Sequence, residues 1–247
     1  MFTLTLAFFG IALLYSTVGF GGGSSYIALL ALSSVPYAFM PKISLLCNLL
    51  VVTGGCYLAF RKKLYSARLL VPFVLTSIPM AYVGGLFPLK ERLFIGLLTV
   101  SLVLSGLRIL FLKERELATV RVPSVATSLA VGGALGLFSG MVGIGGGIFL
   151  SPVLINMGWA RSKNAAAVAS AFIFLNSLAG LAGQFTKDPV LPDFQLCLPL
   201  FFAVLLGGQI GSRIGTHSRV SYLWIQRGTG ALTLLVGGKL LLQVLSS

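Results

Sequence analysis

Long apolar runs alternate with short polar or basic connections along this chain, a pattern typical of helices that cross a membrane. A spanning helix needs about 20 consecutive apolar residues. Uninterrupted runs that meet this length are separated by charged clusters and cover residues 43–60, 69–89, 93–112, 164–186, 194–212 and 222–245. The sequence therefore predicts six intact transmembrane helices.

Two further apolar segments are each interrupted by glycines. The sequence VGFGGG at residues 18–23 returns in the second half of the chain as VGIGGG at residues 142–147. Glycine within a helix costs about 1 kcal/mol relative to alanine, so three in a row predict a helix break. In a membrane, broken backbone is tolerated only where protein buries it or where it lines a wet cavity. Matched interruptions in two halves are typical of transporter binding sites.

The glycines have a second interpretation, because small residues also allow helices to pack closely. We favour a functional break, since both copies occur in the same register. The arms of the first segment, roughly 3–18 and 24–36, and those of the second, 125–142 and 148–158, suit half-crossings. Each segment could be one kinked helix or a re-entrant hairpin that returns to its own side.

Basic residues discriminate between these two arrangements, because they concentrate on the cytoplasmic side of membrane proteins. If all eight segments crossed, the 18 basic residues would divide evenly between the two sides. If both broken segments are re-entrant, a minority faces the outside, namely Lys42, Lys90, Arg92, Lys187 and Lys239. The hairpin arrangement places both termini outside and the linker 113–121 in the cytoplasm.

The predicted fold is thus an all-α polytopic membrane protein of eight apolar segments in two repeats. Residues 1–112 form the first repeat and residues 122–247 the second, and each contains a glycine-broken segment and three transmembrane helices. Three is an odd number of crossings, so the two repeats are predicted to be inverted in the membrane.

Composition excludes a soluble domain. Hydrophobic residues make up 57% of the chain and charged residues 9%, whereas soluble domains carry about 25% charged residues. A net charge of +13 would indicate nucleic acid as the partner of a soluble protein. Here the basic residues lie in clusters between apolar runs, where orientation and anionic lipid headgroups explain them. We therefore predict a multi-pass protein of the plasma (inner) membrane, with the lipid bilayer and no nucleic acid as partner.

Acidic residues are absent from the interior of every apolar segment. All five lie in connections or at helix ends: Glu91, Glu114, Glu116, Asp188 and Asp193. Proton relays and many cation sites in membranes use buried carboxylates, so the sequence argues against a carboxylate-based cation or proton carrier. It also shows no cluster of catalytic side chains and no CxxC spacing, and we expect no enzymatic activity, no cofactor and no metal site.

The remaining polar groups suit a small anion. A glycine turn exposes backbone N–H groups that can surround an anion, and a helix beginning at Ser24-Ser25 would direct its positive end toward the same point. The second copy lacks these hydroxyls. Asn48 and Asn176 could contact the substrate or join helices. The predicted substrate site comprises Gly19, Gly21, Gly22, Gly23, Ser24, Ser25, Asn48, Gly143, Gly145, Gly146, Gly147 and Asn176.

The chain resembles the sulfite exporter TauE/SafE family. The resemblance rests on the paired glycine motifs at 19–23 and 143–147, on the chain length of 247 residues and on the basic central linker. It implies a multi-pass inner-membrane transporter, since some members are assigned to export of sulfite, sulfoacetate or related organosulfur anions. The resemblance supplies no catalytic residue and does not set the substrate.

We therefore predict export of a small anion, sulfite or an organosulfonate. An anion leaving a cell that is negative inside gains about 2.3 kcal/mol per 100 mV, so an exporter needs no coupling ion. One alternative is uptake of an organic or sulfur-containing anion coupled to a cation. Another is a non-transporting subunit for assembly or sensing. As residues of the connections, Lys42 and Lys187 are expected to be dispensable for binding.

Overall fold

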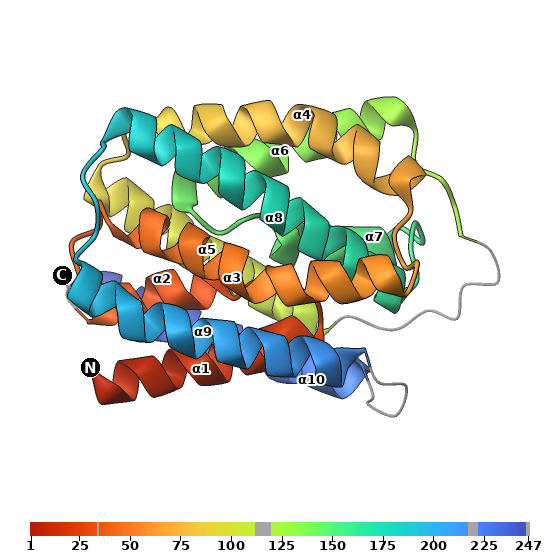
Figure 1. Ribbon diagram of the computed structural model, residues 1–247. Coiled ribbons are helices and arrows are strands. Elements are labelled where there is room, and N and C mark those ends of the chain that lie inside the picture. The colour runs from red at the N-terminus through yellow and green to blue at the C-terminus, as the bar shows by residue number, and fades with distance from the viewer. Residues whose placement is uncertain (34, 112–119, 217–221, 246–247) are drawn as a thin grey trace.

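The computed structural model describes residues 1–33, 35–111, 120–216 and 222–245, and secondary structure in these ranges is helical. In these ranges ten helices follow one another and lie lengthwise beside one another (Figure 1). They are α1 (Phe2–Thr17), α2 (Gly23–Leu32), α3 (Met40–Arg61), α4 (Ala67–Leu86), α5 (Glu91–Leu110), α6 (Val125–Val142), α7 (Gly147–Asn156), α8 (Ser162–Lys187), α9 (Phe194–Gly215) and α10 (Tyr222–Leu245).

Among the described residues, six helices are long and apolar enough to cross a membrane, namely α3, α4, α5, α6, α8 and α9. Five of them coincide with predicted spans. The run 222–245, also predicted to span, forms α10. The arm 125–142, expected to suit a half-crossing, forms α6, an uninterrupted helix of 18 residues that is also long and apolar enough to cross a membrane.

Close packing against α4 explains why α6 tolerates its internal glycines. Gly132, Gly136 and Gly140 lie four residues apart on one face of α6. A Cβ atom at these positions would collide with the backbone of Phe73, Ser77 and Ala81 respectively, all on α4. Small residues at this spacing let two helix backbones approach each other. In α6 itself, glycine therefore has the packing role that was the alternative interpretation of the motifs.

The same kind of contact joins the first helix to the ninth. Gly207, Gly211 and Gly215 of α9 face the backbone of α1 at Phe9, Leu13 and Thr17, where added Cβ atoms would again collide. These two tight pairs, α4 with α6 and α1 with α9, lie on either side of α3 and α8. The two halves of the chain are thus interleaved, because each tight pair takes one helix from each half.

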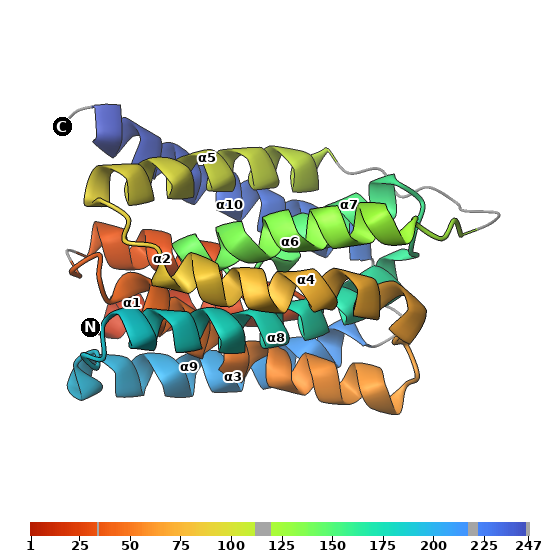
Figure 2. The same cartoon turned by 90° about the horizontal axis from the view of Figure 1, so that it is seen from above.

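Both glycine-broken segments fold back on themselves. The start of α1 and the end of α2 lie at the same end of the bundle, whereas the start of α6 and the end of α7 lie together at the opposite end (Figures 1 and 2). The connections 87–90 and 188–193 belong to the first end, which we call the terminal end because the N-terminus and the end of α10 lie there. The connections 62–66 and 157–161 belong to the other, the linker end.

The outer surface of the bundle is apolar between its two ends. Large side chains such as Leu75 of α4, Leu104 of α5 and Phe202 of α9 are exposed to 64%, 61% and 59%. Such a surface is unfavourable in water but suits contact with lipid chains.

Candidate functional site

The first glycine motif ends one helix and begins another. Helix α1 ends at Thr17, and the backbone then passes through positive φ at Gly19 (+80°) and Gly22 (+86°) before α2 begins at Gly23. Residues with a Cβ atom rarely adopt this conformation, whereas glycine does so without strain. Gly21, the remaining glycine of the motif, keeps a negative φ.

The second motif makes a similar break with a different backbone path. Helix α6 ends at Val142, and three glycines follow with positive φ, namely Gly143 (+85°), Gly145 (+85°) and Gly146 (+78°). Helix α7 then begins at Gly147. The two copies begin and end at equivalent residues but differ in backbone conformation at their second glycine, Gly21 and Gly145, so they are related and not identical.

The two motifs meet around one face of α3. The hydroxyl of Ser44 lies 3.0 Å from the carbonyl oxygen of Gly23 and 2.8 Å from that of Gly143, so its proton can be shared between both motifs. One turn later, Asn48 Nδ2 donates to the carbonyl oxygen of Ile144 at 2.9 Å. Tertiary structure therefore brings the two motifs into one centre, which we call the glycine junction: residues 19–24 and 143–147 with Ser44 and Asn48.

Glycine is required at the junction by lack of space as well as by backbone conformation. A Cβ atom on Gly21 would collide with Oδ1 of Asn48, and one on Gly23 would lie 2.5 Å from Nδ2 of the same side chain. On the other motif, a Cβ atom on Gly145 would lie 2.9 Å from this Nδ2 atom. Asn48 thus touches both motifs, as a substrate-contacting or helix-joining residue would.

The other asparagine of the predicted site, Asn176, is less directly connected with the glycine junction. Asn176 of α8 donates from Nδ2 to Phe172 in its own helix at 2.8 Å. Its neighbour Ser177 lies against the junction, since a Cβ atom on Gly145 would be 2.9 Å from the Ser177 hydroxyl oxygen. Sequence analysis missed Ser44 and Ser177. The spacing of Ser44 and Asn48, one helical turn, could have indicated the first of them.

The two serines after the first motif have different surroundings. Ser25 forms a hydrogen bond with the hydroxyl of Tyr15 at 2.7 Å, and Tyr15 also bonds Thr233 of α10. Ser25 therefore belongs to a buried network that joins α1, α2 and α10. Ser24 is 2% exposed, and its hydroxyl oxygen has no protein hydrogen-bond partner.

Several other buried polar atoms near the motifs also lack a protein partner. They are Oδ1 of Asn48, Oδ1 of Asn176 and the hydroxyl oxygens of Ser139 and Ser177. Buried polar groups normally have a hydrogen-bond partner in the protein or in bound water. Since no side chain caps α2 or α7, the N–H groups of their first turns also point out of the helices. This arrangement can bind a small polar solute, and the two helix N-termini favour a negative one.

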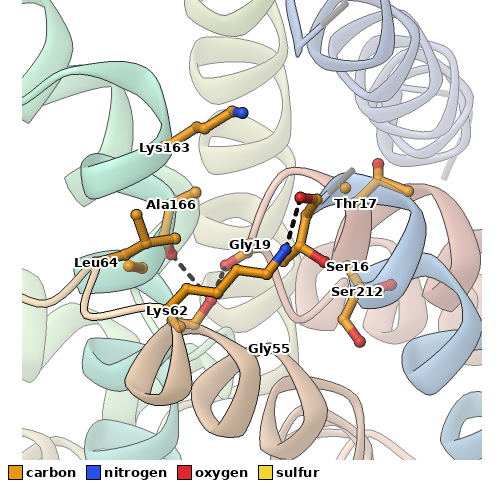
Figure 3. Close-up of a pocket in the computed structure, with 14 residues that line it drawn as sticks. Ser16, Thr17, Gly19, Gly55, Lys62, Leu64, Lys163, Ala166 and Ser212 are labelled. Carbon is orange, nitrogen blue, oxygen red and sulfur yellow. Dashed lines mark hydrogen bonds between the residues drawn. The ribbon is translucent and has the colours of Figure 1, made fainter. Parts of the chain in front are cut away.

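A pocket of about 140 Å³ connects the first motif with the linker end (Figure 3). Gly19 lies in its wall, and the hydroxyl of Ser170 donates to the Gly19 carbonyl at 3.0 Å. Lys62 reaches across the pocket and donates to the carbonyl of Thr216 at 2.8 Å, and the exposed Lys163 also lines it. From the sequence, both lysines were attributed to membrane orientation and to anionic lipid headgroups, because their proximity to Gly19 depends on tertiary structure.

A second pocket, of about 180 Å³, opens at the terminal end. Its wall includes Pro41, whose backbone lies against Gly143 as that of Ala166 lies against Gly19. Lys187 and Asp188 also line it, and the Lys187 ammonium group donates to Oε1 of Gln184 at 2.8 Å. Each motif therefore has a pocket beside it, and the two pockets open at opposite ends of the bundle.

The expectation that Lys42 is a loop residue is wrong. Lys42 lies in the first turn of α3 and is completely buried. Its ammonium group donates to the Asp188 carboxylate at 2.9 Å and to the carbonyls of Asp188 and Val190 at 2.7 and 2.8 Å. The local sequence resembled a connection because Pro36 and Pro41 precede Lys42, but Pro41 fits the first turn of a helix.

The contact with Lys42 also shifts the titration of Asp188. The pKa of this carboxyl group is lowered, because Lys42 donates a hydrogen bond to it and the Val190 N–H donates a second. We call the Lys42–Asp188 contact the terminal-end latch, since it fastens α3 to the connection between α8 and α9.

Metal-binding side chains are not grouped in the described part of the chain. No cluster of three or more His, Cys, Asp or Glu side chains occurs there. Polar groups of the junction are neutral, and its charge preference therefore comes from backbone dipoles.

Comparison with known proteins places the chain among membrane transporters. The family model described as Sulfite exporter TauE/SafE matches residues 4–240. A curated protein of Sinorhizobium fredii (strain NBRC 101917 / NGR234), described as probable membrane transporter protein y4hK, is 35% identical over 244 residues. The aligned region covers 96% of this chain and 97% of that protein. No solved structure matches the chain.

Proposed function

Because the chain belongs to the sulfite exporter TauE/SafE family, we propose that it exports a small anion, sulfite or an organosulfonate, through the glycine junction. Family membership makes the chain a multi-pass membrane transporter and not an enzyme. Identity of the anion, direction of transport and location of the site belong to the proposal.

The observation that carries the proposal is the convergence of two helix N-termini on neutral polar side chains. A small anion can accept hydrogen bonds from backbone N–H groups of α2 and α7, from Nδ2 amide groups and from hydroxyls. Carboxylates would oppose an anion, and the described acidic residues, Glu91, Asp188 and Asp193, all lie at the terminal end and outside the junction. These features favour an anion over a cation as the bound solute.

The lysines of the linker-end pocket support an outward direction. Lys62 and Lys163 would raise the local concentration of anions beside Gly19. Most basic residues belong to the linker end, which the positive-inside rule assigns to the cytoplasm. An anion that starts from this side moves down the membrane potential when it leaves the cell. The charge asymmetry therefore fits export without a coupling ion.

The two pockets fit alternating access between inverted repeats. Residues 1–112 and 122–247 remain the proposed repeats, with the linker 113–121 between them; its residues 113–119 lie outside the described ranges. If the two repeats are exchanged, α1 corresponds to α6 and α9 corresponds to α4, so the α1–α9 pair matches the α6–α4 pair. The contact between Gly19 and Ala166 likewise matches the contact between Gly143 and Pro41. In this proposal each pocket is one half of the pathway, and the junction is reached from one end at a time.

Uptake coupled to a cation is the less favoured transport mode. Because the described residues include no buried carboxylate, backbone carbonyls would have to hold the coupling cation. The carbonyls of Gly23 and Gly143 face the hydroxyl of Ser44, and that of Ile144 accepts from Asn48, so these oxygens already have donors.

The proposal is tested by flux of sulfite from liposomes that contain the purified protein. We expect sulfite efflux that rises with a membrane potential negative inside and needs no sodium or proton gradient. Taurine-type sulfonates, sulfate and carboxylates serve as competing solutes. Efflux that requires a cation gradient would support coupled transport, and absence of flux for every anion would support a non-transporting subunit.

The site is tested by two glycine-to-alanine substitutions, one at a crowded position and one where a Cβ atom would have free space. Gly21→Ala would push against Asn48, although Gly21 needs no positive φ. The matched control is Gly10→Ala, because no atom lies within 4 Å of a Cβ atom there. We expect loss of flux in Gly21→Ala and normal flux in the control. Equal flux in Gly21→Ala and the control would place the pathway elsewhere.

A further inference from the structure

A third pocket, distinct from the proposed pathway, lies at the linker end on the flank formed by α4 and α6. Its volume is about 310 Å³. Three arginines line it, each from a different part of the chain: Arg68 from the first turn of α4, Arg121 from the segment before α6, and Arg161 from the connection before α8. Tertiary structure alone gathers these three charges, which lie far apart in the sequence.

The backbone around this arginine pocket is held in place by contacts of its own. The N–H of Arg121 donates to the Gly158 carbonyl at 2.9 Å, which fixes the segment before α6 against the turn after α7. Asn164 donates from Nδ2 to the Leu64 carbonyl at 2.9 Å, which joins α8 to the connection before α4. These hydrogen bonds therefore hold the segments that form the pocket in fixed positions relative to one another.

No acidic side chain among the described residues neutralises the positive charge of the three arginines in the pocket. Glu91, Asp188 and Asp193 all lie at the terminal end of the bundle. Two helices begin at the pocket, since Ser66 precedes α4 and Arg161 precedes α8, and neither residue caps its helix with a side chain. The positive ends of α4 and α8 thus add to the three guanidinium groups.

Apolar side chains also line the pocket. Trp159 lines it and packs against Phe73 of α4, with ring centroids 6.3 Å apart, and Leu69 and Pro123 lie beside it. Two residues after Leu69 and Pro123, Val71 of α4 and Val125 of α6 are exposed to 46% and 63%. The pocket therefore sits where the apolar outer surface of the bundle gives way to its charged end, which is the depth of lipid headgroups.

From this combination we propose that the arginine pocket binds a phosphate group. Guanidinium groups and helix N-termini are the usual partners of phosphate oxygens. The phosphate can belong to an anionic lipid, whose glycerol and chains would contact the apolar lining residues, or to a small soluble phosphate. This site is separate from the glycine junction and does not depend on the anion that is transported.

Fluorescence of Trp159 gives a local readout of binding. In a Trp224→Phe background Trp159 is the remaining tryptophan, because the chain contains two. The protein is placed in bilayers of phosphatidylcholine with a small fraction of brominated phosphatidylglycerol, and in matched bilayers with brominated phosphatidylcholine. A second arm titrates inorganic phosphate and glycerol phosphate into the detergent-solubilised protein.

The test variant changes Arg68, Arg121 and Arg161 to glutamine. The matched control changes Arg61, Arg108 and Arg213, which lie in the linker-end half of the molecule, are exposed and do not line the pocket. Each basic side chain near an anionic surface contributes roughly a factor of five, so we expect about a hundredfold weaker binding in the test variant only. Melting temperatures verify that both triple variants are folded.

Selective quenching of Trp159 by brominated phosphatidylglycerol, lost in the test variant and kept in the control, would identify a lipid phosphate. A saturable response to soluble phosphate with the same dependence on the three arginines would identify a soluble one. Equal quenching by both lipids together with no response to phosphate would overturn the proposal. Equal binding by the test and control variants would overturn it as well.

Discussion

Gly22 and Gly146 occupy equivalent positions, each directly before the first residue of a helix. Both have positive φ, and a Cβ atom would lie 2.9 Å from Ile11 and Tyr26 at Gly22 and 2.9 Å from Phe172 at Gly146. A β-branched residue resists this backbone conformation and also needs space that neighbours occupy. Each position therefore combines conformational and steric reasons for glycine.

We predict that Gly22→Val and Gly146→Val each abolish sulfite flux while the protein still inserts into the membrane. Displacement of the motif would move the N–H groups that we propose bind the anion. The measurement is flux per amount of inserted protein, with Gly10→Ala as the control for glycine loss elsewhere in α1. Normal flux in both valine variants would show that the glycines of the motifs serve only helix packing.

The serines after the first motif provide a second residue-scale prediction, because only one is engaged within the protein. Ser24→Ala should weaken anion binding and leave the melting temperature nearly unchanged, since its hydroxyl has no protein partner. A hydrogen bond to a charged ligand contributes about 1.5–3 kcal/mol. Ser25→Ala should lower the melting temperature, because it removes a partner of Tyr15. Sulfite binding and thermal unfolding are measured for both purified variants. The opposite result, in which Ser24→Ala lowers the melting temperature and Ser25→Ala weakens binding, would contradict the prediction.

Among the elements, α3 connects most parts of the proposed pathway. Its first turn carries Lys42, its second turn Ser44 and the next Asn48, while its last residues lead to Lys62 in the linker-end pocket. Movement of this single helix would therefore change the latch, the junction and one pocket together. This makes α3 the element on which alternating access would depend.

The terminal-end latch predicts a pH dependence of stability. Asp188 has a lowered pKa in the folded protein, compared with about 3.9 for an unperturbed Asp. A lowered folded-state pKa stabilises the fold above the unfolded value and loses this effect as the pH falls through the folded value. Asp188→Asn should therefore melt at a lower temperature than the wild type at neutral pH, with the difference shrinking below about pH 4.

The control for this experiment is Asp193→Asn, which changes the same charge in the same connection. Asp193 caps α9 by accepting from the Gln195 N–H at 2.9 Å, and asparagine caps helices equally well. Its melting curve should follow that of the wild type through the whole pH series. A difference between wild type and Asp188→Asn that persists unchanged to low pH would contradict the assigned role of the latch.

Across the whole molecule, the arrangement of ends leads to a topology prediction. The start of α1 and the end of α10 lie at the terminal end, whereas α5 ends and α6 begins at the linker end (Figure 2). Basic residues favour the cytoplasm, so we predict a cytoplasmic linker and external termini. Reporter fusions after residue 117 and after the C-terminal residue measure this, and a cytoplasmic C-terminus would refute the hairpin topology.

Much of the fold is determined by the sequence because membrane insertion depends on local composition. Apolar runs of the required length became α3, α4, α5, α8 and α9, and both glycine motifs ended one helix and began the next. A bilayer imposes the same length on each spanning segment wherever it lies in the chain. Consecutive glycines likewise interrupt a helix through their own backbone freedom.

Relationships between distant segments were decided only by tertiary structure. The glycines inside α6 do not break it, because α4 packs close enough to make them contact residues. Lys42 is buried because Asp188 reaches it from the connection after α8. Ser44 and Asn48 belong to the glycine junction because both motifs approach the same face of α3. None of these pairings has a local pattern, since each depends on which helices pack together, and packing places the candidate site.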